Sequence, residues 1–181
     1  MSQRPWYKRL GASGRRLSEA DRYFERGLYY YRRNKLDLAL ADLDEALLRD
    51  PKRAEYYVAR GFMLLQSGWA DDAEADFAYS LRLDPTQWLA YYGRGMQAFQ
   101  NGDNAQAVNQ FSRAQRIAPD RPEIYFHRAV AFYEMGNADQ AVLDMEFSLK
   151  LLEANDRRRA QAEQWLTIFR SATPVRPTPQ S

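Results

Sequence analysis

The sequence contains no cysteine and only one histidine, His127. The absence of cysteine excludes disulfide bonds, a thiol nucleophile and every cysteine-ligated zinc or iron–sulfur site. A single histidine excludes a metal site built from several imidazoles and leaves a histidine acid–base pair without its second member. No apolar stretch approaches the roughly 20 residues that a membrane-spanning helix needs. We therefore expect no enzyme active site, no metal and no other cofactor.

The N-terminal segment lacks two common targeting signals. Residues 1–16 contain no apolar core of the kind found in secretory signal peptides. Ser2 stands where N-myristoylation requires glycine. These features predict a cytoplasmic protein, with peripheral attachment at the cytoplasmic face of a membrane as a second option.

Charge is distributed unevenly along the chain, although the formal net charge is only +2. Residues 1–18 carry five basic and no acidic side chains, whereas residues 19–154 carry a net charge of −6. Residues 155–181 carry a net charge of +3. The sequence thus has an acidic body between basic ends, a pattern that indicates an interaction segment at a terminus.

The chain repeats itself with a period of 34 residues, and the four copies align without gaps. Aligned columns of identical or similar side chains are typical of a repeat architecture, in which each copy forms the same structural unit. The columns are Tyr23, Tyr57, Tyr91 and Tyr125; Arg26, Arg60, Arg94 and Arg128; Gly27, Gly61, Gly95 and Ala129; Ala39, Ala73, Ala107 and Ala141; Leu43, Phe77, Phe111 and Met145; and Pro51, Pro85, Pro119 and Glu153.

Each copy is expected to form two helices. In the second copy the pattern predicts one helix over residues 54–66, which ends at Ser67 and Gly68, and another over residues 71–82, which ends before Pro85. A glycine inside a helix costs about 1 kcal/mol relative to alanine. The glycine column is therefore expected to let the paired helix approach closely, with the alanine column opposite it.

This pattern resembles the tetratricopeptide repeat (TPR), which has a 34-residue period and the motif W-x2-L-G-x2-Y…A-x3-F…P. The matching positions in two copies are Tyr57, Gly61, Leu64, Ala73, Phe77 and Pro85, and Tyr91, Gly95, Ala98, Ala107, Phe111 and Pro119. The resemblance covers residues 20–153. It implies an all-α, right-handed α-solenoid of four helix-turn-helix units, at residues 20–53, 54–87, 88–121 and 122–155. It also implies a role in binding other proteins.

In one respect the chain departs from the family pattern, because arginine replaces leucine before the glycine column in all four units. A charge that is repeated on a packed helix needs a partner. An acidic or amide side chain follows each arginine sixteen residues later, which predicts a ladder of four pairs. A second interpretation is that the arginines bind carboxylates of a ligand. The predicted pairs are Arg26–Asp42, Arg60–Asp76, Arg94–Gln110 and Arg128–Asp144.

The resemblance implies that the first helix of each unit lines a concave face, where family members commonly bind peptides. Apolar or aromatic residues occupy this face in every unit, which disfavours the class that binds chaperone C-terminal carboxylates through Lys, Asn and Arg. These residues either pack neighbouring helices together or form an aromatic groove for an apolar helix or extended segment. His127 lies beside them and is interpreted as a structural or rim residue. The candidate groove residues are Phe24, Tyr31, Phe62, Tyr92, Met96, Phe99, Phe126 and Tyr133.

The two ends of the array are expected to differ. Ser18 and Asp21 form a capping-box pattern, which starts the first helix near Glu19. Residues 156–170 predict a capping helix, and residues 171–181, with three prolines, predict an extended tail. The first unit has no preceding helix, so the arm, a partner or a second copy covers it. The capping helix has one apolar stripe, formed by Ala162, Trp165, Leu166 and Phe169.

Residues 1–18 form a basic arm, in which aromatic and cationic side chains alternate. Three roles remain open for it: ordering on a protein partner, contact with an anionic membrane surface, and contact with nucleic acid. We predict a non-catalytic interaction scaffold or adaptor, an accessory or assembly subunit of a larger complex, with no small-molecule substrate. The alternative is a regulatory module whose arm contacts membrane or nucleic acid. The arm residues concerned are Arg4, Trp6, Lys8, Arg9, Arg15 and Arg16.

Overall fold

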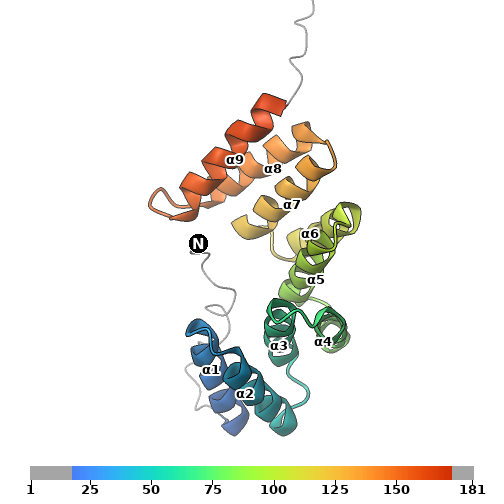
Figure 1. Cartoon of the computed structure of the whole chain (residues 1–181), viewed down its shortest axis with the longest axis vertical. Helices are drawn as coiled ribbons and strands as arrows, with labels where there is room; N and C mark the ends of the chain where they lie inside the picture. Colours follow the sequence, from blue (N-terminus) through green and yellow to red (C-terminus); the bar gives the residue numbers. More distant parts are fainter. Residues whose placement is uncertain (1–17, 173–181) are drawn as a thin grey trace, which may run out of the picture. The chain divides into compact units, whose positions relative to one another are not determined.

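The computed structural model describes residues 18–172, which form nine α-helices and no strand (Figure 1). The all-α fold class predicted from the sequence is confirmed. The first of these helices begins at Glu19, where the Ser18–Asp21 capping box is formed. The helices are α1 (Glu19–Arg32), α2 (Leu36–Arg49), α3 (Ala54–Gln66), α4 (Ala70–Leu83), α5 (Trp88–Gln100), α6 (Asn104–Ile117), α7 (Pro122–Glu134), α8 (Ala138–Leu151) and α9 (Arg158–Ala172).

The same three-residue turn joins the two helices of each repeat. Its middle residue has a positive φ, a conformation that glycine adopts without strain and that asparagine tolerates better than most residues. The following backbone N–H then bonds to a carbonyl five residues back, as from Trp69 N to Leu64 O at 3.0 Å. The turn residues are Asn34 (φ 57°), Gly68 (83°), Gly102 (78°) and Gly136 (76°).

The described residues divide into two compact units, with the boundary inside α5 between Gln97 and Ala98. In the first unit α1 packs on α2, α2 on α3, and α3 on α4. An added Cβ on Gly27 would lie 3.1 Å from the Ala39 carbonyl oxygen, and the Ala39 side chain is fully buried. The glycine and alanine columns therefore mark the close approach of paired helices here.

Phe77 of α4 joins three helices of the first unit. Its ring is fully buried between two glycines, Gly61 on α3 and Gly93 on α5. A Cβ built on Gly61 would lie 2.8 Å from Phe77 Cε1, and one built on Gly93 would lie 2.4 Å from Phe77 Cζ. Both distances are shorter than any van der Waals contact, so the aromatic ring occupies the space that the missing side chains leave.

In the second unit α7 packs on both α6 and α8, and α9 packs on α8. The α9 helix buries Ala162, Leu166 and Phe169, and half-buried Trp165 lies with its ring 5.5 Å from that of Phe169. Compared with the predicted range of 156–170, α9 begins and ends two residues later. The later start has a physical reason, because an oxygen of the Asp156 carboxylate accepts the N–H of Arg158 at 2.9 Å.

Within residues 18–172, none of the helices combines the length and the apolar composition that crossing a bilayer requires.

Candidate functional site

Three of the four predicted arginine pairs are in contact in the structure. In each pair the guanidinium donates Nε and Nη2 to the two oxygens of one carboxylate. The distances are 2.6–2.7 Å for Arg26–Asp42, 2.8 Å for Arg60–Asp76 and 2.7–2.8 Å for Arg128–Asp144. This forked arrangement links the first helix of a repeat to its second helix, and charge assistance makes it stronger than a neutral pair.

The structure gives the fourth arginine a different partner. Arg94 donates Nε and Nη2 to the Glu74 carboxylate, at 3.1 and 2.7 Å. Gln110, its predicted partner, is buried in the second unit, where its Oε1 accepts no hydrogen bond from any described residue. A carboxylate offers Arg94 an opposite charge and two acceptor oxygens, which a neutral amide cannot match.

Two of these arginines also reach the helix that precedes their own repeat. Arg60 Nη1 donates to Asp44 at 2.6 Å, and Arg128 Nη1 donates to Ser112 at 3.0 Å. The hydrogen bonds to Asp76 and Asp44 raise the pKa of the Arg60 guanidinium above its ordinary value. Because protein carboxylates already occupy these guanidinium groups, the contacts favour the structural interpretation of the row over carboxylate binding from a ligand.

Burial separates the eight candidate groove residues into two groups. Phe24, Phe62 and Tyr92 are buried, and Phe62 and Tyr92 have exposed fractions of only 9% and 6%. Their rings pack within the first unit: Phe24 lies 4.7 Å from Tyr56, and Phe62 lies 5.3 Å from Phe77. These three residues fit the packing interpretation, since little of their surface remains for a partner.

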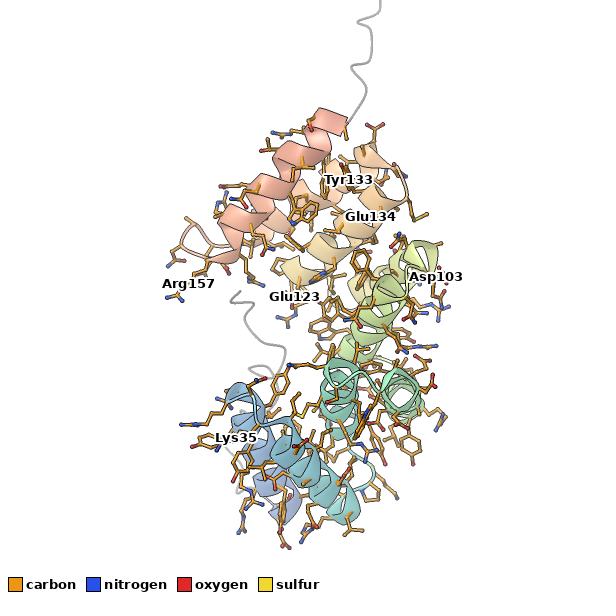
Figure 2. All side chains as sticks on the ribbon, viewed as in Figure 1. Lys35, Asp103, Glu123, Tyr133, Glu134 and Arg157 are labelled. Atoms are coloured by element: carbon orange, nitrogen blue, oxygen red, sulfur yellow. The ribbon has the colours of Figure 1, made fainter. Side chains whose placement is uncertain are left out.

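The other five groove candidates are half-buried, and three of them lie in the second unit. Phe99 comes from the end of α5, and Phe126 and Tyr133 come from α7. All three pack against the buried cluster of α7, α8 and α9, and the Tyr133 ring lies 4.8 Å from Phe169. Tyr133 is labelled near the end of α7 in Figure 2. In the first unit the half-buried candidates are Tyr31 and Met96.

His127 is placed among aromatic rings of the second unit. Its imidazole lies 5.2 Å from the Phe126 ring and 6.2 Å from the Phe111 ring. Burial lowers the pKa of His127 to about 4, so the ring is neutral at pH 7. Among residues 18–172, no three histidine, aspartate or glutamate side chains are arranged to hold a metal ion.

Residues 1–17 of the predicted basic arm lie outside the described residues, as do residues 173–181 of the predicted tail. The roles considered for Arg4, Trp6, Lys8, Arg9, Arg15 and Arg16 therefore stay predictions. Residues 171 and 172, assigned to the tail from the sequence, belong to α9.

A pocket of about 320 Å³ lies between α2, α3 and α4 in the first unit, and the sequence analysis did not anticipate it. Trp69 stands at its edge in the turn before α4 and is 56% exposed. The sequence contains one signal for Trp69, because the residues at the same repeat position in later units, Asp103 and Asn137, are polar. The residues that give the pocket its chemical character are Leu40, Asp44, Arg60, Trp69, Asp72 and Asp76.

Two family models match the chain. The model for the tetratricopeptide repeat matches residues 24–88, and a second model, described as TPR repeat, matches residues 97–136. Together they cover more than half of the sequence. A search of curated protein sequences finds no match.

Solved structures with similar folds include two of MamA. The crystal structure of MamA protein aligns with a TM-score of 0.67 and 20% identity, covering 84% of this chain and 81% of that one. The structure of MamA 41-end from Desulfovibrio magneticus RS-1 aligns with a TM-score of 0.69 and 19% identity, covering 86% and 85%. The APC/C hetero-tetramer Cut9-Hcn1 aligns with a TM-score of 0.76 and 19% identity, covering 84% of this chain and 30% of that one.

Sequence identities of about 20% establish the fold and nothing further. The fold agrees with the repeat pattern, the paired helices and both family matches. This chain is a member of the tetratricopeptide repeat family.

Proposed function

We propose that this protein is a non-catalytic adaptor that binds a segment of a partner protein as an accessory or assembly subunit of a larger complex. The observation that carries the proposal is the match of TPR models to residues 24–88 and 97–136. One of the similar structures, Cut9-Hcn1, is itself a hetero-tetramer. The contacts of the arginine row also support such a role, because carboxylates of this chain already occupy these guanidinium groups.

The binding site that we propose lies on the second unit and consists of Phe99, Phe126 and Tyr133. Each side chain is half-buried, so it is held by packing while part of its surface meets solvent. Aromatic side chains held in this way are common anchors of protein interfaces, because they bury large apolar areas at a small cost in conformational entropy. An apolar helix or an extended apolar segment is the partner that suits them.

The experiment is the affinity capture of partners by the full chain, followed by measurement of the same complex with variants. Phe99→Ala combined with Phe126→Ala should weaken the complex by about tenfold or more, since interface aromatics contribute most of the binding energy. Ile168→Ala is the matched control, because Ile168 is an exposed apolar residue on α9 outside the proposed site.

Circular dichroism must show that the double variant keeps its helicity at the temperature of the assay, because both side chains also pack against the core of the second unit. A folded double variant that binds its partner as tightly as the unmodified chain would overturn the proposed site. Equal losses for the double variant and Ile168→Ala would overturn it as well.

A further inference from the structure

The pocket of the first unit is negatively charged. Asp44, Asp72 and Asp76 face it, and among the described residues that line it Arg60 is the only cation. Arg60 is already engaged, because it donates to both Asp76 and Asp44. Among the residues that the structure describes, Asp72 forms neither an ion pair nor a hydrogen bond. The pocket therefore holds more negative charge than its own arginine balances.

Trp69 is a separate observation. It stands at the N-cap of α4 without a capping hydrogen bond, and its indole is 56% exposed. Asp103, which is labelled in Figure 2, stands at the same position of α6, and its side chain accepts the Gln106 N–H at 2.9 Å. Lys35 at the same position of α2 makes no capping hydrogen bond either, but tryptophan, unlike lysine, leaves a large part of an apolar ring exposed to solvent.

The backbone of Trp69 would accept a capping residue. Its φ and ψ are −91° and 70°, and those of Asn137, which caps α8, are −95° and 70°. An asparagine at position 69 would thus match the dihedral angles of a residue that caps in this chain. Backbone geometry therefore does not explain the tryptophan at position 69.

We propose that this pocket binds an arginine or lysine side chain from a basic segment of a partner protein. The cation contacts the face of the Trp69 indole while the Asp72 carboxylate balances its charge. An aromatic face beside a carboxylate suits a guanidinium best, because its flat surface stacks on the ring while its edge donates hydrogen bonds. This site differs from the aromatic site of the second unit in both chemistry and location, so either proposal can fail alone.

The test uses the full chain labelled with ¹⁵N and a peptide of sequence Gly-Ser-Arg-Gly-Ser-Arg-Gly-Ser. The expected result is that this peptide shifts the indole N–H resonance of Trp69 and leaves those of Trp88 and Trp165 in place. A peptide with glutamate in place of both arginines should shift none of them. Equal shifts with the two peptides, or none with the arginine peptide at millimolar concentration, would overturn the proposal.

Trp69→Asn separates recognition from stability. It should weaken binding of the arginine peptide about tenfold, as expected for the loss of an interface tryptophan. It should also raise the melting temperature by about 3 °C, because it restores a cap that the helix lacks. Unchanged peptide affinity in this variant would overturn the proposal, whatever its melting temperature.

Asp72→Asn should weaken binding of the same peptide several-fold, whereas Asp71→Asn should leave it nearly unchanged. Asp71 is the matched control, since it is an exposed neighbour on α4 that does not line the pocket. Equal effects of the two substitutions would indicate only general attraction to an acidic surface and would overturn a specific site.

The chain's own basic arm is the competing occupant, and the full chain also tests it. One variant replaces all five arm cations with glutamine. If this variant binds the arginine peptide more than threefold more tightly, the arm occupies the pocket and the assignment to a partner is overturned. Unchanged affinity supports the partner. The replaced residues are Arg4, Lys8, Arg9, Arg15 and Arg16.

Discussion

The Arg128–Asp144 pair offers the sharpest test of a structural role for the arginine row. Both side chains are largely buried, with exposed fractions of 14% and 12%. Arg128 donates two hydrogen bonds to Asp144 and a third to Ser112. Replacing Arg128 with methionine leaves the carboxylate buried without a cation, which should lower the free energy of unfolding by about 3 kcal/mol. Asp144→Leu leaves the guanidinium without its anion and should cost a similar amount.

The double variant removes both charges and places apolar side chains in the space between α7 and α8. Its cost should be no greater than that of either single change, so the coupling energy should be at least about 3 kcal/mol. Urea unfolding followed by circular dichroism measures the stability of the four proteins of this double-mutant cycle: the unmodified chain, the two single variants and the double variant. Costs that simply add, with a coupling energy below about 0.5 kcal/mol, would refute the reasoning. The Arg26–Asp42 pair should couple less, because the Arg26 side chain is 54% exposed and water can solvate it.

Three further predictions follow from packing and titration. Unfolded His127 has a pKa near 6.5 and folded His127 one of about 4. Between these two pKa values the unfolded state therefore binds more protons than the folded state. Acidification from pH 7 to pH 4 should lower the free energy of unfolding by about 3 kcal/mol through His127. His127→Gln should remove this contribution to the pH dependence. If the unmodified chain and His127→Gln showed the same dependence of the free energy of unfolding on pH, measured by urea unfolding, the prediction would be contradicted. Gly93→Ala should lower the free energy of unfolding by about 2 kcal/mol by clashing with the Phe77 ring, and adding Phe77→Leu should recover part of the loss. Tyr56→Phe should cost about 1 kcal/mol in thermal unfolding, because it removes the 2.7 Å hydrogen bond to Asp21; an unchanged melting temperature would contradict this.

The helices were predictable because the residues that indicate where helices pack and end recur from repeat to repeat. In the second repeat the range predicted for the first helix, 54–66, coincides with α3, and the range predicted for the second, 71–82, lies one residue inside each end of α4. The residue with positive φ recurs at the same repeat position, as glycine in three copies and as Asn34 in the first, so a single structural reason applies to every copy. Fold class therefore followed from the period, without any knowledge of long-range contacts.

The arginine contacts were predictable only within one repeat. A fixed spacing of sixteen residues identifies Asp76 for Arg60, because both belong to the same helix pair. The second partner, Asp44, belongs to the preceding repeat, and so does Glu74, which pairs with Arg94. How consecutive repeats pack decides these contacts, and the column pattern carries no information about that packing.

The candidate sites show the limits of periodicity more clearly. Apolar residues on one face of a helix follow the same pattern whether they pack in the core or meet solvent, so the sequence could not distinguish buried Phe62 from half-buried Phe126. Trp69 was missed for the opposite reason, since its repeat position holds four different residues and forms no column. The contrast with Asp103 at the same repeat position was visible in the sequence, but its meaning required the exposure of the indole and the pocket beside it.

Site-specific photo-cross-linking tests the adaptor proposal most directly. A benzophenone amino acid replaces Phe126 in the full chain, and the same amino acid replaces Ile168 on α9 as the control. The predicted result is one dominant cross-linked partner protein from position 126 and none from position 168. The absence of a cross-link from position 126, or the same products from both positions, would contradict a partner-binding site on the second unit.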